Sequence, residues 1–241
     1  MKYVAIDIET TGLNPENCQI LSIGAVIEDT NDIKPLQDLP TFHGIIESNR
    51  IEGEPYAINL NRELISLIVE YQSVPSKERK ASYFGRENVT FHKKEDIVEA
   101  FYYWLAGNGF VKFNDMSSGG YVKMESGKML PMITNQTKPI HITVAGKNFG
   151  TFDLRFLEKL PRWNQLIKVR QRILDPTILY TDWKNDESLP SLSKCKKRAN
   201  MTEVVSHDAV EDSFDVIALL RKEYNKKKQI NYVPKKRLLN I

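Results

Sequence analysis

Several features that would assign a protein to a class at once are absent from this chain of 241 residues. It has only two cysteines, Cys18 and Cys195, which match no zinc-binding spacing and make no disulfide framework. No stretch approaches the roughly 20 apolar residues that a membrane-spanning helix needs. The N-terminus lacks a basic segment followed by a long apolar run, so we expect no secretory signal. The sequence therefore predicts a reduced, cytoplasmic setting and no membrane partner.

A nucleotide-binding loop is also excluded. Gly146-Lys147 lacks the upstream glycine and the following serine or threonine of a P-loop. The length fits one large α/β domain, or a core with an insertion. We expect an α/β domain over residues 1–228, with an inserted loop or hairpin at about 110–139, and a basic C-terminal tail over 229–241.

The net charge of +3 indicates little about binding partners, but the distribution of charge along the chain indicates more. Eight basic residues and the single acid Glu223 lie between Arg221 and Arg237. Such a basic run either forms a solvated surface or binds along the backbone of a polyanion. Two further basic clusters lie upstream, the first at Lys168, Arg170 and Arg172 and the second at Lys194, Lys196, Lys197 and Arg198.

The order of elements predicts a mixed sheet flanked by helices. The first two strands meet through the Asn14-Pro15 turn, which indicates an antiparallel three-stranded meander. Apolar spacing and turn residues predict strands at 2–8, 18–28, 41–47 and 140–146, and helices at 57–71, 94–106, from 151, 189–199 and 208–227.

Two acidic residues follow each other at strand spacing in YVAIDIETTGL. With a period of two, Asp7 and Glu9 project from the same face at the end of an apolar strand. Burying two like charges is costly unless a cation or a proton compensates them. The pair therefore predicts a divalent metal site.

A second acidic cluster lies near the C-terminal end of the domain, in SHDAVEDSF. Asp208 and Glu211 form a capping-box pattern, so a helix is expected to begin with Asp208 as its N-cap. His207 then lies in the loop before the helix and Asp212 in its first turn. With the helix beginning between them, both can face one point.

A third cluster lies in AGKNFGTFDLRFL, where Asn148 occupies a turn and Asp153 the start of a helix. Together, Asp7-x-Glu9 followed by Thr10-Thr11-Gly12-Leu13, then Asn148-x4-Asp153, then His207-x4-Asp212, resemble the DEDDh 3′→5′ exonucleases. These include the proofreading exonucleases of replicative polymerases, ribonuclease T, oligoribonuclease and phage exonucleases. The resemblance covers roughly residues 1–30 and 140–222.

The resemblance implies a ribonuclease-H-like fold and hydrolysis from the 3′ end of single-stranded DNA or RNA, releasing nucleoside 5′-monophosphates. It also implies two divalent cations, Mg²⁺ or Mn²⁺, that stabilise the attacking and leaving oxygens. Asp7 would bridge both ions, with Glu9 and Asp212 on the nucleophile side and Asp153 on the other. His207 would accept the proton of the attacking water. The implied substrate contacts are Thr10, Thr11, Gly12, Leu13 and Asn148.

Alternatives stay open at this point. The chain could be an accessory proofreading subunit of a polymerase, or a catalytically silent nucleic-acid-binding module. The sequence does not determine whether the protein forms a homodimer, associates with a polymerase, or prefers DNA or RNA. His43, His92 and His141 lie in no motif and are interpreted as structural, and no role is assigned to Asp175.

Overall fold

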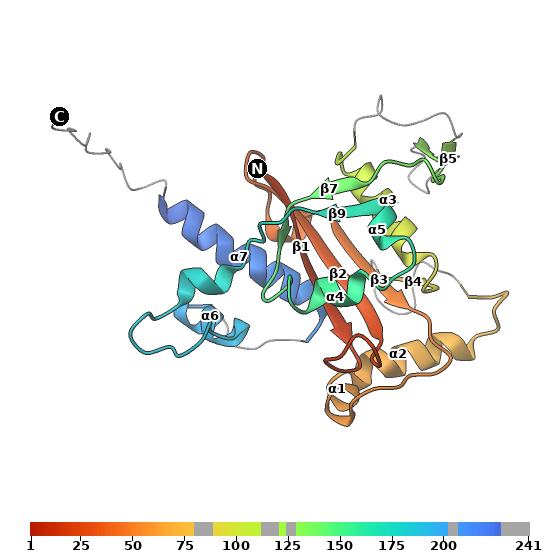
Figure 1. Cartoon of the computed structure of the whole chain (residues 1–241), viewed down its shortest axis with the longest axis horizontal. Helices are drawn as coiled ribbons and strands as arrows, with labels where there is room; N and C mark the ends of the chain where they lie inside the picture. The colour runs from red at the N-terminus through yellow and green to blue at the C-terminus, as the bar shows by residue number, and fades with distance from the viewer. Residues whose placement is uncertain (80–88, 112–120, 124–128, 202–206, 228–241) are drawn as a thin grey trace.

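The computed structural model describes residues 1–79, 89–111, 121–123, 129–201 and 207–227. Its centre is a five-stranded sheet with the strand order β4-β3-β2-β1-β8 (Figure 1). The strands are β1 (Lys2–Thr10), β2 (Ile20–Asp29), β3 (Thr41–Ile46), β4 (Val89–His92) and β8 (Val144–Ala145). The predicted mixed α/β class is confirmed.

The first three strands form the expected antiparallel meander, with β2 between β1 and β3. The outer strands β4 and β8 pair in parallel with β3 and β1. The strand β1 continues through Thr10, two residues beyond the predicted end, so Asp7 and Glu9 both lie within the paired strand.

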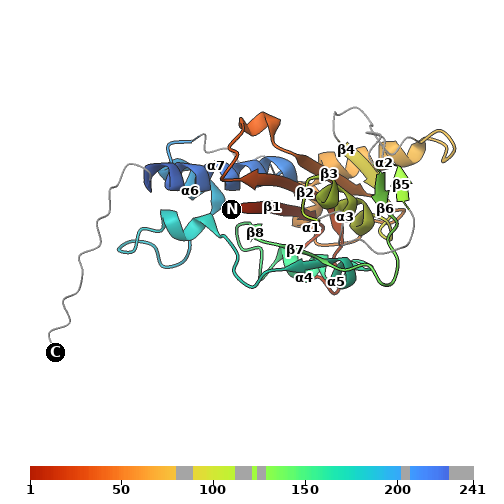
Figure 2. The ribbon, with the colours of Figure 1, turned by 90° about the horizontal axis from the view of Figure 1, so that it is seen from above.

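Helices cover both faces of the sheet (Figure 2). One face carries Val4, Ile6 and Ile8 of β1, which pack in one apolar cluster with residues of three helices. These helices are α3 (Ile97–Gly107), α4 (Asp153–Leu157) and α5 (Trp163–Leu166). A small parallel sheet, β7 (Ile140–Ile142) with β9 (Ile167–Val169), lies on the same side.

The opposite face carries Tyr3 and Ala5, and therefore also Asp7 and Glu9, because side chains alternate along a strand. The long helix α7 (Ala209–Lys227) packs there against β1 and β2, together with α6 (Leu192–Arg198) and the 3₁₀ turn η3 (Pro176–Tyr180). The helix α2 (Arg62–Ser73) covers β3 and β4 through a separate apolar cluster.

Two predicted elements are interrupted. The helix expected at 57–71 is two helices, α1 (Pro55–Leu60) and α2, which meet at Asn61. The buried Asn61 amide donates to the carbonyls of Thr10 and Ala57, so the break ties the helices to the end of β1. The strand expected at 140–146 is split at Thr143, and its halves join different sheets.

The short elements β4, β9 and α5 were not predicted, because runs of three or four residues carry too little periodicity. Within 110–139 the structure contains an antiparallel pair, β5 (Tyr121–Lys123) with β6 (Met129–Pro131). The predicted tail at 229–241 lies outside the described residues. Among the helices that the structure describes, none combines the length and apolar character needed to cross a bilayer.

Candidate active site

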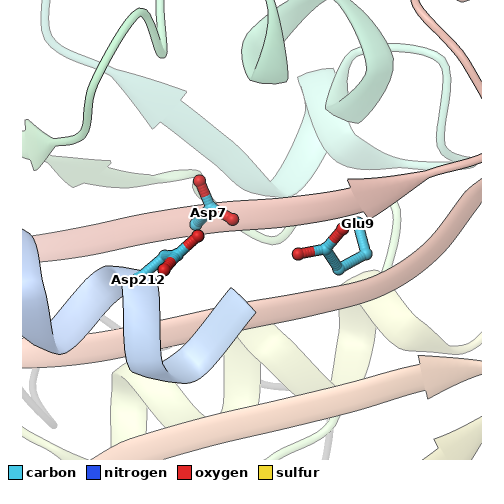
Figure 3. A group of neighbouring side chains, drawn as sticks. All are labelled: Asp7, Glu9 and Asp212. Atoms are coloured by element: carbon cyan, nitrogen blue, oxygen red, sulfur yellow. The ribbon is translucent and has the colours of Figure 1, made fainter. Parts of the chain in front are cut away.

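Three carboxylates predicted from two separate motifs converge on one point. Asp7 and Glu9 extend from β1, and Asp212 reaches toward them from α7 (Figure 3). One side-chain oxygen of each lies within 4.8 Å of the others. Glu9 and Asp212 are buried, and Asp7 is partly buried. This convergence joins residues that are about 200 positions apart in the chain.

The close approach of α7 depends on a glycine in the neighbouring strand. Gly24 pairs with Asp7 across the sheet, and the backbone of Ala209 lies directly over it. A Cβ atom at Gly24 would lie 2.2 Å from the Ala209 carbonyl carbon. The Ser213 hydroxyl donates to the Gly24 carbonyl at 3.2 Å, which fixes the helix in this position.

The start of α7 is capped as predicted. The Asp208 carboxylate accepts hydrogen bonds from the backbone N–H groups of Val210 and Glu211 at 3.0 and 3.2 Å. His207 precedes the cap with a left-handed φ of 51°, and Asp212 lies in the first turn. The cap therefore sets the position of Asp212 relative to β1.

The fourth acid, Asp153, approaches β1 from the other side. The strand β8 pairs with β1 as far as Ala145, so among the described strands none provides an acceptor for the backbone N–H of Ile8. That N–H donates to the Asp153 carboxylate at 3.2 Å. Asp153 is 3% exposed and begins α4. It therefore lies beside Asp7, although it is not among the three most closely grouped acids.

All four acids hold their protons more tightly than ordinary carboxyl groups. Burial, and after it the charge of Asp212, raise the pKa of Glu9 to about 8. Burial likewise raises the pKa of both Asp153 and Asp212 to about 7. The pKa of Asp7 lies well above its ordinary value because of burial and then the neighbouring charge of Asp153. Without a cation, these groups oppose each other's ionisation.

This donor set fits hard divalent cations. Carboxylate oxygens are the preferred ligands of Mg²⁺ and Mn²⁺. One oxygen of Asp212, Oδ1, is buried and has no hydrogen-bond partner among the described residues, which is unfavourable unless a ligand satisfies it. The crowded acids and this unsatisfied oxygen are consistent with divalent metal use.

The acids line a cleft of about 630 Å³. His207 is exposed, and it lines this cleft together with a second hollow of about 480 Å³ between α7 and the α1–α2 junction. Glu9 lines both as well. The cleft thus brings together the four predicted acids, Asp7, Glu9, Asp153 and Asp212, with His207.

The loop after β1 is held firmly at one side of this cleft. The Thr11 side chain is buried, and its hydroxyl donates to the Glu52 carbonyl and accepts from the Gln19 N–H. The Thr10 hydroxyl donates to the Gly12 carbonyl at 2.8 Å. Leu13 lines the cleft and is 72% exposed. Of these residues, Leu13 is the one that lines the cleft.

Asn148 lines the cleft at the turn between β8 and α4. Its φ of 60° lies in the left-handed region, which asparagine tolerates better than most residues. Its N–H donates to Asp175 at 3.0 Å, and its side-chain oxygen accepts from the Thr151 hydroxyl. Sequence reasoning assigned Asp175 no role, yet Asp175 supports this turn and also accepts from Thr177.

The basic cluster on α6 is largely neutralised within the protein. Lys194 and Arg198 both pair with Asp186, and the buried Lys196 pairs with Asp215 of α7. These cations stabilise the packing of α6 and are not freely available to a polyanion. The residues Lys168, Arg170 and Arg172 are exposed.

Comparison with known proteins identifies solved structures with a similar fold. No family model matches the chain, and no curated protein sequence matches it. The zinc-bound complex of E. coli exonuclease I with single-stranded DNA is similar in structure, with a TM-score of 0.52 and 13% identity. The match covers 95% of this chain and 41% of that chain.

Two other solved structures give the same result. The complex of E. coli exonuclease I with a dA16 oligonucleotide matches with a TM-score of 0.52 and 12% identity over 95% of this chain and 42% of that one. Exonuclease I from Methylocaldum szegediense matches with a TM-score of 0.50 and 12% identity over 95% and 41%. The chain spans about two fifths of the length of these exonucleases. The likeness shows the fold, which is the predicted ribonuclease-H-like arrangement.

Proposed function

We propose that this protein is a metal-dependent 3′→5′ exonuclease of the DEDDh type, acting on single-stranded DNA or RNA. The observation that carries the proposal is the convergence of Asp7, Glu9 and Asp212 within 4.8 Å, in one cleft with Asp153 and His207. The fold shared with exonuclease I supports it. The products would be nucleoside 5′-monophosphates.

In this proposal the four acids would provide ligands for two cations. Asp7, Glu9 and Asp212 would hold one, and Asp7 with Asp153 would hold a second. When bound, two such ions stabilise negative charge on the attacking and leaving oxygens of a phosphodiester. One oxygen of Asp153 accepts from Ile8, so its other oxygen would face the cation, directly or through water.

His207 is assigned as the general base. Its imidazole lies in the loop before the Asp208 cap, exposed and lining the cleft of the acids. It would take the proton from the attacking water, a role that contributes about 10²–10⁴-fold to rate. His207→Ala is expected to reduce kcat by that range while the protein still binds metal, as measured by Mn²⁺ titration. Loss of metal binding in this variant would assign His207 a structural role.

The substrate strand would enter over the loop at Thr10–Leu13 and the turn at Asn148. Leu13 would wedge beside the last base, and the Thr10 backbone would meet the terminal 3′-OH. Exonuclease I of E. coli has been seen with single-stranded DNA, which favours a single-stranded substrate here. Homodimer formation and association with a polymerase stay predictions, which size-exclusion chromatography with and without a polymerase would test.

The decisive experiment uses end-labelled DNA and RNA oligonucleotides of one sequence, with and without Mg²⁺. We expect stepwise shortening from the 3′ end, dependent on Mg²⁺ and blocked by a 3′-terminal cap. Asp7→Asn should remove activity, whereas Glu211→Gln, an exposed acid in the same turn as Asp212, should not. Internal cleavage, shortening without a divalent cation, or binding without hydrolysis would contradict the proposal.

The basic tail has a separate test. The predicted tail at 229–241 lies outside the described residues and carries Lys235, Lys236 and Arg237. If these guide the strand, a chain ending at Lys228 should show a higher KM with a weaker salt dependence, and little change in kcat. An unchanged KM at all salt concentrations would show that the tail is a solvated surface.

A further inference from the structure

A basic residue lies at the cleft that holds the acids. Of the described residues that line it, Lys147 is the only lysine or arginine. Resting on the proposed function, we infer that the Lys147 ammonium binds a non-bridging oxygen of the 3′-terminal phosphodiester and stabilises its charge during hydrolysis. No sequence motif pointed to this residue, because Gly146-Lys147 fails the P-loop pattern.

The backbone around Lys147 is fixed on both sides. The Gly146 N–H donates to the Leu174 carbonyl at 3.2 Å, and the Asn148 N–H donates to Asp175 at 3.0 Å. Gly146 also packs too closely for a side chain, because a Cβ would lie 2.9 Å from the Ile6 carbonyl oxygen. The position of Lys147 at the cleft is therefore set by the fold rather than by a free loop.

The Lys147 side chain is exposed and available to a ligand. Within the part of the chain that the structure describes, it forms no ion pair, in contrast to Lys194, Lys196 and Arg198. It is close enough to the acids to matter electrostatically. Burial is the main influence on the pKa of both Asp7 and Asp153, and the Lys147 charge partly offsets it.

A phosphodiester bound in this cleft would add negative charge that Lys147 can offset. Two divalent cations would balance the formal charge of the four carboxylates but not that of the bound phosphodiester. In the reaction, a water oxygen forms a bond to phosphorus and gives up a proton to His207. The bond from phosphorus to the O3′ of the shortened strand breaks, and O3′ leaves with the electron pair and takes a proton from solvent water. Lys147 keeps its own protons throughout. It donates a hydrogen bond to the phosphoryl oxygen, whose negative charge it stabilises.

The test compares Lys147→Gln with Lys184→Gln, which changes an exposed lysine outside the cleft. Binding of labelled oligothymidylate is measured in EDTA, where hydrolysis is stopped. One oligonucleotide has ordinary linkages, a second has an uncharged methylphosphonate at the 3′-terminal linkage, and a third has it at the next linkage. Thermal unfolding of each variant confirms that the fold is retained.

For the ordinary oligonucleotide and for the third, we expect Lys147→Gln to weaken binding about tenfold and to reduce the salt slope by about 0.7, the value for one phosphate contact on a single strand. The second oligonucleotide should bind wild type and variant equally. With Mg²⁺, kcat/KM should fall on the order of 10²-fold, as for loss of one donor to a phosphoryl or oxyanion group. Lys184→Gln should match wild type.

An effect that persists with the neutral terminal linkage, or that is equal for Lys184→Gln, would overturn the assignment. So would the absence of any binding by the wild type. If the wild type binds but hydrolyses no oligonucleotide in Mg²⁺, the proposed function fails while the binding comparison still decides whether Lys147 contacts the terminal phosphate.

Discussion

Replacing Glu9 with glutamine separates the unfavourable burial of its charge from its use as a metal ligand. The side chain is 8% exposed, and burial raises its pKa from 4.5 to about 8. A carboxyl group whose folded pKa is raised binds its proton more tightly in the folded state than in the unfolded state. Its contribution to stability is therefore present at low pH and is lost as the pH rises through the folded pKa.

The magnitude follows from the pKa difference. One pKa unit corresponds to about 1.4 kcal/mol, so the rise sets an upper limit of roughly 5 kcal/mol above pH 8. Because water and structural relaxation weaken such effects, we expect Glu9→Gln to stabilise the metal-free protein by about 2 kcal/mol. For a protein of this size, that would raise Tm by roughly 4–8 °C.

The assay is thermal unfolding in EDTA and in Mg²⁺ at two pH values. In EDTA at about pH 9 the variant should be more stable than wild type, and at about pH 5 the difference should nearly vanish. In Mg²⁺ the order should reverse, because a cation at a hundredfold excess over its Kd stabilises the wild type by about 2.7 kcal/mol. The variant lacks one ligand and should gain less. Activity should be lost.

A lower Tm for Glu9→Gln in EDTA at high pH would refute this reasoning. So would a difference that does not change with pH, since that would reflect packing rather than charge. Glu211→Gln is the matched control, because Glu211 is exposed and lies one residue before Asp212. Its substitution should leave Tm unchanged in all four conditions.

Further substitutions test how α7 is placed. Gly24→Ala should displace the start of α7, lower stability by about 1–3 kcal/mol and reduce Mg²⁺-dependent hydrolysis by roughly 10²-fold, since small misplacements are costly in catalysis. Gly107→Ala is the control, because a Cβ there would meet nothing within 4 Å among the described residues, and it should change neither stability nor the rate. A normal rate in Gly24→Ala would show that the close approach of α7 is unimportant. Arg221→Ala should cost about 3–5 kcal/mol in chemical denaturation, because it leaves the fully buried Glu28 carboxylate unpaired. Adding Glu28→Gln should restore part of that loss, and a single-variant cost below about 1 kcal/mol would mean that the pair contributes little.

The placement of the candidate residues on their strand and helix was predictable because each lies beside a strong local signal. The apolar run before Asp7 and Glu9 predicts a strand, and a period of two places both acids on one face. The Asp208 capping pattern predicts the start of a helix, which locates His207 and Asp212 on either side of it. The meander of the first three strands was predictable in the same way.

The boundaries and breaks depended on contacts between distant segments. Asn61 interrupts a periodic helix because its amide binds the end of β1, which no local pattern reveals. The strand expected at 140–146 splits because one half pairs with β1 and the other with β9. Asp175 supports the Asn148 turn from 27 residues away.

The electrostatics of the site were decided by the tertiary structure alone. The sequence shows four basic residues on α6, but the fold pairs three of them with Asp186 and Asp215. It leaves Lys147, an unremarkable lysine in the sequence, as the lysine of the cleft. The sequence identifies which charged groups are present. Burial and distance determine which of these charges remain for a ligand. Both are set only when segments about 200 residues apart pack together.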